Sequence, residues 1–150
     1  MNVYFPNGQM GEERLRYKLR FYDVFLDYIG EIQKKGIPLV LTGDFNTAHQ
    51  PVDLAEPEKN ARTSGFLPIE REKIDLYLQH NLVDIFRVRN PEQKAYTYWS
   101  YFANARIRNL GWRIDYFFVD EKIKTWLKSA FILDQVVGSD HCPVGIEIER

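Results

Sequence analysis

The sequence has little of what marks a secreted or membrane-spanning protein. It contains one cysteine, Cys142, so an intrachain disulfide is excluded, and a lone thiol suits a reducing compartment such as the cytoplasm. No apolar run approaches the roughly 20 residues that a membrane helix needs, and no stretch resembles a signal peptide. The 20 Lys and Arg against 21 Asp and Glu give a net charge of −1. That balance excludes a uniformly basic nucleic-acid coat and leaves room for a local basic patch.

The length and composition predict one globular domain over residues 1–150. The chain is 45% hydrophobic and contains no internal repeat, low-complexity segment or linker. A domain of this size buries roughly 68–70% of its unfolded surface. Residues 2–6 alternate like a strand at the very start of the chain. Two interpretations of this start are open: a terminus tied down by pairing, or a chain that lacks a preceding half.

Apolar periodicity places helices early in the chain and strands late. Spacings of four and three residues predict an amphipathic helix over residues 13–33. Its expected buried face consists of Leu15, Leu19, Tyr22, Leu26 and Ile29. Further helices are expected from Pro68 and over residues 121–128. Strands are expected over residues 38–42, 96–100, 113–119, 130–137 and 143–149. This order predicts an α/β class protein with a mixed (α+β) sheet rather than a doubly wound fold.

The first group of residues that could carry chemistry follows the expected strand 38–42. Asp44 and Asn46 are two positions apart, and the two-residue period of a strand would aim both side chains to one side. An anionic oxygen and an amide oxygen suit a hard cation such as Mg²⁺, which keeps several of its waters. The competing interpretation is a simple turn, since Gly, Asp and Asn are turn formers.

The second group lies in an expected loop between the last two strands. It consists of Ser139, Asp140 and His141. Asp140 can ligate a cation, and a histidine is easily poised between acid and base near neutral pH. The alternative is a surface loop whose Ser and Asp bond the local backbone.

A third candidate is a carboxylate inside an apolar strand. Asp115 is flanked by Ile114 and Tyr116, and burying a carboxylate without a partner is costly. His141 would be a suitable partner, because a carboxylate that orients a histidine fixes its tautomer and stabilises the imidazolium form. A structural ion pair elsewhere is the alternative.

The fourth feature is a basic and aromatic segment. From Asp84 to Arg113 the chain carries six basic and two acidic side chains, interleaved with aromatic rings. Cations and stackable rings together fit a polyanion that carries bases or sugars. The alternative is a solvated rim over a core of aromatic residues.

Taken together, these segments resemble the exonuclease III / apurinic-apyrimidinic (AP) endonuclease family. The motifs that carry the resemblance are Asn2-Val3-Tyr4-Phe5-Pro6-Asn7, Thr42-Gly43-Asp44-Phe45-Asn46-Thr47-Ala48-His49, Ser64-Gly65-Phe66-Leu67-Pro68, Tyr96-Thr97-Tyr98-Trp99, Asn104-Ala105-Arg106, Gly111-Trp112-Arg113-Ile114-Asp115-Tyr116 and Gly138-Ser139-Asp140-His141-Cys142-Pro143. They occur in the family's order and span nearly the whole chain. Gly-Asp-x-Asn alone is a modest signal, whereas the joint set is highly specific.

The resemblance implies half of a four-layered α/β sandwich of the endonuclease/exonuclease/phosphatase type. Residues 1–150 would form the C-terminal half. The family's N-terminal half brings an Asn-rich motif and a glutamate metal ligand, and neither has a counterpart here. We therefore expect an apolar sheet face that the absent half would cover, and self-association through that face.

The resemblance also implies a catalytic centre. Asp44 would orient or deprotonate the attacking water, with Asn46 beside it. His141, oriented by Asp115, would stabilise the charge that develops on the phosphate. Asp140, Asp44 and Asn46 would hold the metal, Mg²⁺ with Mn²⁺ as the alternative.

The implied DNA contacts come from several further segments. Tyr4 and Asn7 would hydrogen-bond the scissile phosphate, Tyr4 as part of the catalytic set. The other expected DNA-binding residues are Tyr98, Trp112 and Ile114, in a pocket for a flipped-out abasic sugar, and Phe102 and Arg106, on a loop that enters the minor groove. The family more often has another aromatic residue where Tyr98 stands.

The implied function is metal-dependent phosphodiester hydrolysis in DNA repair. The enzyme would cut double-stranded DNA 5′ to abasic sites, with 3′-to-5′ exonuclease activity as a second activity. Its expected location is the cytoplasm, at the nucleoid in a prokaryote, and no membrane partner is expected. Two alternatives remain: a truncated fragment that folds and binds DNA without cutting, and a phosphatase of the same superfamily acting on another phosphodiester. Trp112 and residues 104–106 favour the DNA nuclease over a lipid-phosphate hydrolase.

Overall fold

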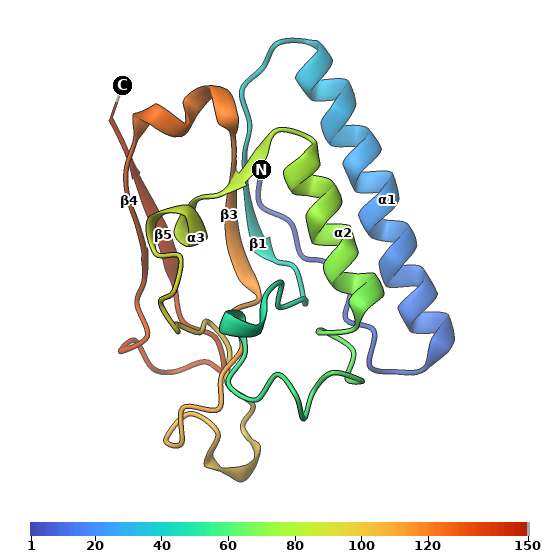
Figure 1. Ribbon diagram of the computed structural model, residues 1–150, viewed down its shortest axis with the longest axis vertical. Coiled ribbons are helices and arrows are strands. Elements are labelled where there is room, and N and C mark those ends of the chain that lie inside the picture. Colours follow the sequence, from blue (N-terminus) through green and yellow to red (C-terminus); the bar gives the residue numbers. More distant parts are fainter. Residues whose placement is uncertain (150) are drawn as a thin grey trace.

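The fold has three layers, as Figure 1 shows: a pair of helices, a central sheet and a two-stranded hairpin. The structure is a computed structural model and describes residues 1–149. The helices are α1 (Glu12–Lys34), α2 (Pro68–Gln79) and α3 (Ile85–Arg89), and the strands are β1 (Val40–Asp44), β2 (Leu82–Asp84), β3 (Asp115–Asp120), β4 (Leu127–Ile132) and β5 (Val144–Ile148). Short 3₁₀ helices cover Pro51–Asp53, Phe102–Asn104 and Glu121–Trp126.

Helix α1 confirms the expected amphipathic helix and buries three of the five residues expected on its inner face. Its buried residues are Lys18, Tyr22, Leu26 and Ile29, which recur every three or four positions. Leu15 and Leu19, which the sequence places on the buried face, are only half-buried. A lysine has taken a core position because α2 supplies a carboxylate to meet it there. None of the helices formed by residues 1–149 combines the length and apolar character that a membrane span requires.

The central sheet is antiparallel, with strand order β1-β3-β2. Successive residues of β3 face opposite layers, as the two-residue period of a strand requires. Phe118 packs with Phe45 and Tyr77 on the side of α1 and α2, whereas Val119 packs with Leu127 beneath the hairpin. Each fully buried Phe or Val contributes roughly 1.5–3 kcal/mol of transfer free energy. The mixed α/β class is therefore confirmed, with β3 as the strand that joins both cores.

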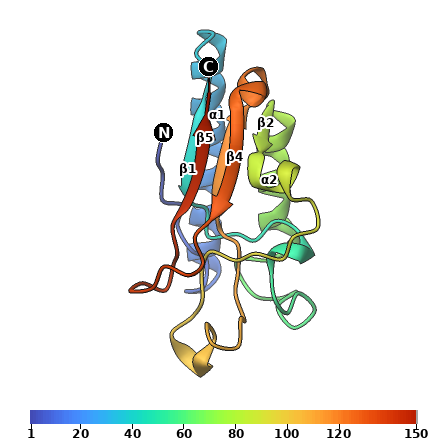
Figure 2. The same cartoon turned by 90° about the vertical axis from the view of Figure 1, so that its left-hand side faces the viewer.

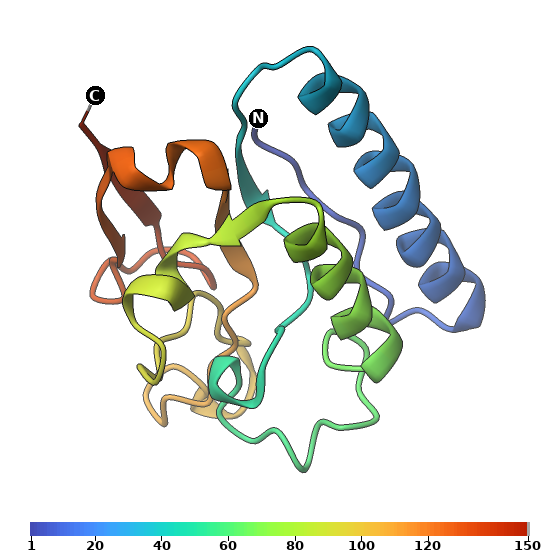
Figure 3. The ribbon, with the colours of Figure 1, turned by 45° about the horizontal axis from the view of Figure 1, so that its top comes forward.

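Three loops meet at one end of the sheet, the lower end in Figures 1 and 2. Strand β1 runs toward this end and β3 starts from it, because the two strands are antiparallel and pair Asp44 with Asp115. Residues 45–67 leave β1 here, residues 90–114 enter β3 here, and residues 133–143 join β4 to β5 here. Figure 3, tilted from the same view, shows these loops below the strands. Segments distant in sequence are thus brought to one place.

Two expected strands form only single bridges. Residues 96–100 contribute Tyr98, which bridges to Trp112 and His141, and residues 2–6 contribute Asn2, which pairs with β1 in parallel. The chain can run this close to β1 because position 43 is a glycine: a Cβ there would lie 1.9 Å from the Val3 carbonyl oxygen.

The late strands differ from expectation at their ends. Strand β3 begins at Asp115 rather than at 113, because the Arg113 N–H bonds the carbonyl of Asp53, outside the sheet. Strand β4 begins at Leu127 and stops at Ile132, so residues 133–137 belong to the loop. Strand β5 lies within the expected residues 143–149.

Candidate active site

A cleft of about 460 Å³ opens where the three loops meet. Ten of the twelve residues that the sequence predicts for the site line it: Tyr4, Asn7, Asp44, Asn46, Tyr98, Phe102, Trp112, Ile114, Asp140 and His141. Asp115 lies directly behind His141 and is bonded to it. Arg106 instead lines an adjacent groove. The structure therefore brings the predicted residues together around a single cavity.

Asp44, the last residue of β1, carries a carboxylate with an unusual environment. The backbone N–H of Asn46 donates to its Oδ1 at 2.7 Å, and the Asn46 amide donates to its Oδ2 at 2.9 Å. Burial raises the pKa of Asp44 to about 6, and the neighbouring Asp115 carboxylate adds to the rise, against the hydrogen bond from Asn46 and the charge of His141. A carboxylate with this pKa is ionised at neutral pH and can still accept a proton.

Asn46 itself adopts the left-handed conformation, with φ of 51°. Its side-chain nitrogen donates to Asp44 and to the carbonyl oxygen of Phe5, at 2.9 Å in each case. The amide oxygen is thereby left to accept from, or bind to, a ligand in the cleft. Asp44 is still part of β1, the backbone bends at Asn46, and both side chains line one cleft.

His141 and Asp115 form the expected pair, with Nδ1 of the imidazole 2.8 Å from Oδ2 of the carboxylate. The histidine side chain is 30% exposed and the carboxylate 15% exposed. Burial lowers the pKa of His141, but the hydrogen bond to Asp115 and the charges of Asp115, Asp44 and Asp140 outweigh it, so the pKa is raised above its usual value. The contact excludes the alternative that Asp115 serves an ion pair elsewhere.

The loop before β5 is held by its own polar residues. The Ser139 hydroxyl accepts from the backbone N–H of His141 at 3.1 Å and donates to the Asp140 carboxylate at 3.2 Å. The carbonyl of Asp140 accepts from Trp99 N–H at 2.8 Å. These local bonds match the alternative interpretation of the loop, and they also orient Asp140 and His141 toward the cleft.

The oxygen donors of the cleft suit a hard divalent cation. Asp44 and Asp140 offer carboxylates and Asn46 an amide oxygen, the ligand chemistry of Mg²⁺, which uses few protein ligands. Asp44 and Asp115 face each other across two paired strands, and the closeness of two carboxylates also favours a cation nearby. Within residues 1–149, however, no three His, Cys, Asp or Glu side chains form a ready metal cluster. The chemistry of Asp44, Asn46 and Asp140 therefore fits a hard cation.

An apolar wall closes one side of the cleft. Trp112 and Tyr98 exchange backbone hydrogen bonds at 2.9 Å, and Ile114 packs beside both in a small buried cluster. Gly65 lies against the indole of Trp112: a Cβ on Gly65 would be 3.2 Å from the ring. The Tyr98 ring stands 5.0 Å from the imidazole of His141, centre to centre. An apolar slot thus adjoins the polar centre.

The rim residues are more exposed than the wall. Tyr4 is 63% exposed and Phe102 is 83% exposed. Asn7 is half-buried, and its carbonyl accepts from Arg14. Phe102 begins a 3₁₀ helix in which Ala103 has a positive φ of 55°. The positions of Tyr4, Asn7 and Phe102 are compatible with contact to a large ligand, and their roles stay predictions.

Arg106 does not point into the cleft. Its guanidinium donates to the carbonyls of Ser139 and Asp134, at 2.9 Å in each case, and to that of Val136, and it stacks 4.7 Å from the ring of Trp99. The arginine therefore ties its own loop to the loop that carries His141. A contact with DNA stays a prediction for Arg106.

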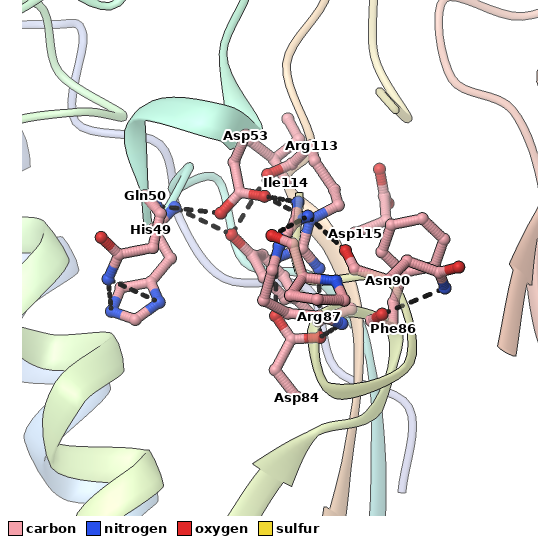
Figure 4. Close-up of polar contacts among 12 residues, drawn as sticks. His49, Gln50, Asp53, Asp84, Phe86, Arg87, Asn90, Arg113, Ile114 and Asp115 are labelled. Atoms are coloured by element: carbon pink, nitrogen blue, oxygen red, sulfur yellow. Dashed lines mark hydrogen bonds and ion pairs between the residues drawn. The ribbon is translucent and has the colours of Figure 1, made fainter. Parts of the chain in front are cut away.

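A buried ionic network lies beneath the site, and Figure 4 shows its members. Arg113 donates to Asp53 at 2.7 Å and to Asp84 at 2.6 Å, and Arg87 also bonds Asp53. Arg89 bonds the carbonyl of Leu127. Arg113 and Arg87 are thus paired inside the protein, so the basic segment of residues 84–113 supplies fewer cations to a polyanion than its sequence suggests.

Sequence comparison identifies the protein family to which this chain belongs. The sequence model of the Endonuclease/Exonuclease/phosphatase family matches residues 2–141. The chain belongs to this family. Among curated relatives, the exodeoxyribonuclease of Bacillus subtilis (strain 168) is 46% identical over 149 residues, which cover 99% of this chain and 59% of the relative. The DNA repair nuclease APEX1 of Danio rerio is 40% identical over 145 residues, which cover 96% of this chain and 46% of the relative.

Solved structures of the Endonuclease/Exonuclease/phosphatase family agree with the fold. The 3′ phosphatase NExo from Neisseria, solved with a product DNA hairpin, has a TM-score of 0.94 and 29% identity, covering 99% of this chain and 60% of its own. The chain thus spans about half to three fifths of the length of these relatives. The resemblance to exonuclease III and AP endonucleases is confirmed, whereas the roles of single residues stay predictions.

This family member also has site residues that sequence reasoning missed. Gln9 and Ser100 line the cleft, and Lys18 and Glu70 meet directly behind it. One signal was available for Lys18, because it lies four residues before Tyr22 on the buried face of a helix. Its partner is 52 positions away in sequence, and nothing in the local pattern connects the two.

Proposed function

We propose that the protein is a DNA-repair nuclease that hydrolyses phosphodiester bonds with a divalent metal, cutting double-stranded DNA 5′ to abasic sites and acting also as a 3′-to-5′ exonuclease. The observation that carries this proposal is the meeting of Asp44, Asn46 and the His141–Asp115 pair around one cleft. The names of the Bacillus subtilis and Danio rerio relatives support a DNA substrate.

The metal would be Mg²⁺, with Mn²⁺ as the alternative. Asp44, Asn46 and Asp140 would hold it, because their oxygens suit a hard cation. When bound, such an ion supplies charge stabilisation to the phosphate oxygens and to the leaving alkoxide.

Asp44 and Asn46 would prepare the attacking water. The Asn46 backbone and side chain fix both oxygens of Asp44 by hydrogen bonds. A fixed carboxylate whose pKa is raised to about 6 can orient a water molecule and take its proton near neutral pH. General-base assistance of this kind contributes about 10²–10⁴ in rate.

His141 would stabilise the charge that develops on the phosphate. Asp115 occupies the Nδ1 side of its ring, which leaves Nε2–H for a phosphate oxygen. Because the pKa of His141 is raised, a larger share of its ring is imidazolium at a given pH than in a free histidine, and this positive charge suits the negative charge that develops on the phosphate oxygens in the transition state. Tyr4 and Asn7, on the rim, would bond the same phosphate.

The apolar wall supports selection of an abasic nucleotide. A nucleotide without a base loses little stacking when it leaves the duplex, so flipping it out costs less free energy. The slot between Tyr98, Trp112 and Ile114 would take the bare sugar, and the Gly65 backbone lies against the indole on its other side.

A second candidate concerns residues 1–150 alone. The chain spans 59% of its Bacillus subtilis relative, and residues 1–149 hold no complete metal cluster. We therefore propose that residues 1–150 are the C-terminal part of the nuclease, and that the remaining metal ligand comes from a preceding part. By itself this part would fold and bind DNA without cutting.

The same proposal concerns the outer face of the β4–β5 hairpin, which is turned toward the viewer in Figure 2. On that side Phe131 of β4, which packs over Gly145 of β5, is 38% exposed. We propose that the preceding part of the protein covers this face, and that residues 1–150 alone self-associate through it. Light scattering of residues 1–150 tests the point, and a monodisperse monomer would contradict it.

A cytoplasmic location, at the nucleoid in a prokaryote, is part of the proposal.

A nicking assay separates the two candidates. The full-length natural protein and residues 1–150 are each incubated with plasmid containing abasic sites, with Mg²⁺ or with a chelator. We expect metal-dependent nicking by the full-length protein only. Nicking by residues 1–150 that Asp44→Asn abolishes would exclude the inert-fragment candidate. Equal nicking of plasmid without abasic sites would contradict the proposed substrate.

A further inference from the structure

A buried lysine reaches the peptide of Asn46 from behind the cleft. Nζ of Lys18, on α1, donates to the Asn46 carbonyl oxygen at 2.6 Å. The Lys18 side chain is fully buried. Asn46 has a positive φ of 51°, a conformation that asparagine adopts more readily than most residues, and the bond from Lys18 holds its carbonyl in this arrangement.

Glu70, in the first turn of α2, completes the arrangement. Its Oε1 accepts from Lys18 at 2.6 Å and from the Ser64 hydroxyl at 2.8 Å. Its Oε2 accepts from the backbone N–H groups of Gly65 at 2.6 Å and Leu67 at 3.1 Å. Both carboxylate oxygens are thus satisfied, and one of these bonds fixes the peptide that backs Trp112.

Stability alone does not account for a pair of charges with no solvent exposure. Replacing a buried ion pair by neutral residues of similar shape is often neutral or stabilising, because the two charges no longer have to be desolvated. A neutral pair would, however, lack the ammonium group that donates a hydrogen bond to the Asn46 carbonyl. What the pair adds is the direction of that peptide.

We infer that Lys18 and Glu70 are positioning residues for the proposed hydrolysis, Lys18 acting through Asn46 and Glu70 through the Gly65 peptide. The inference rests on the proposed function and names two residues that do not touch the substrate. Asn46 delivers two hydrogen bonds to Asp44, one from its backbone at 2.7 Å and one from its side chain at 2.9 Å. Both depend on the backbone conformation of Asn46, and Lys18 holds the Asn46–Thr47 peptide that follows this residue.

The kinetic test uses Lys18→Met in the full-length natural protein, assayed on a duplex with one abasic site. We expect kcat per folded molecule to fall about tenfold or more while KM changes by about twofold or less, because displacement of catalytic groups affects the chemical step most. The matched control is Leu26→Ala, a buried position on the same helix. It lowers the unfolding midpoint and leaves kcat unchanged. An unchanged kcat in Lys18→Met overturns the inference.

A substitution cycle asks whether Lys18 acts through Asn46. In an Asn46→Ala background, Lys18→Met is expected to lower kcat by no more than about twofold, because the group it positions is already gone. A tenfold loss in both backgrounds would mean that Lys18 acts by another route, and overturns the inference. Should Lys18→Met not fold, Lys18→Met/Glu70→Gln removes the unpaired charge while keeping the shape. It is expected to fold and to show the same loss of kcat, and full activity in it contradicts the inference.

A second readout needs no activity. The backbone amide of Asn46 is protected from hydrogen exchange by its bond to Asp44. We expect this amide to exchange about tenfold faster or more in Lys18→Met than in Leu26→Ala of matched unfolding midpoint, and equal exchange overturns the inference. If the unsubstituted protein does not cut abasic DNA, the proposed function fails, and the exchange measurement still decides the positioning of Asn46.

Discussion

Asp44, the last residue of β1, lies directly opposite Asp115, the first residue of β3, so two carboxylates face each other across antiparallel strands. Like charges in such a position destabilise a sheet by about 0.2–1 kcal/mol. Burial first, and then this neighbour, raise the pKa of Asp44 to about 6. Proteins retain unfavourable contacts of this kind mainly at functional sites. Here the contact leaves the Asp44 carboxylate ready to take up a proton or a cation.

The pH dependence of stability should show this strain. The folded-state pKa of Asp44, about 6, exceeds its ordinary value of 3.8. The unfolded state therefore ionises first, and the contribution of Asp44 to stability is lost as pH rises from 3.8 to about 6. Urea unfolding of the unsubstituted protein and of Asp44→Asn is the measurement. We expect the free energy of unfolding of the unsubstituted protein to fall relative to Asp44→Asn across that window. Parallel curves would contradict the raised pKa.

The His141–Asp115 pair makes an opposite and separable prediction. Because the pKa of His141 is raised when folded, its stabilising contribution is fully present below its unfolded value of 6.5 and is lost as pH rises through the higher folded value. Asp115→Asn should lower the pKa of His141, which imidazole NMR signals report directly. Asp134→Asn, an exposed carboxylate with no bond to the ring, is the control and should leave the titration of His141 in place.

Two glycines should respond to alanine in opposite directions. Gly65 has φ of +101°, and an added Cβ would lie 3.2 Å from the Trp112 ring, so Gly65→Ala should destabilise the protein by about 1 kcal/mol or more and impair abasic cleavage. Gly30, inside α1, has open space around it, and Gly30→Ala should stabilise by about 0.5–1 kcal/mol. Thermal unfolding checks both signs. Equal shifts would show that the wall at Trp112 is not tightly packed.

The buried network below the cleft should be costly to break. Asp53→Ala leaves the Arg113 and Arg87 charges without their shared partner and should cost about 3–5 kcal/mol. Asp23→Ala removes the partly exposed pair with Lys73 and should cost no more than about 1 kcal/mol. Chemical denaturation of the two variants gives the comparison. A loss of less than 1 kcal/mol for Asp53→Ala would mean that the network contributes little.

Much of the candidate active site could be predicted, because its residues stand out in their local sequence or require a specific partner. Strand β1 follows in part from the apolar run of residues 38–42, although it continues through Gly43 to Asp44, and Asp115 needed a partner because it stands among aromatic residues. His141 met that need, and the structure confirms the pair at 2.8 Å. Helix α1 followed from its apolar spacing with nearly correct ends.

What could not be predicted depends on partners far away in sequence. Lys18 is a surface residue by type, and only the carboxylate of Glu70 makes its burial acceptable. The hydrogen bonds of Arg106 to carbonyls of the loop around Val136 are another case, because their partners lie about 30 positions further along the chain. Residues 96–100 have the composition of a strand but pair only through Tyr98, because loops rather than strands lie beside them.

The most direct test is single-turnover cleavage of an end-labelled duplex that contains one abasic site, by the full-length natural protein with Mg²⁺. The account predicts one product that ends in a 3′ hydroxyl immediately 5′ of the abasic residue, absent with a chelator and slowed by about 10²-fold or more in Asp44→Asn and in His141→Asn. No product at enzyme excess, or a product formed at the same rate in both variants, would contradict it.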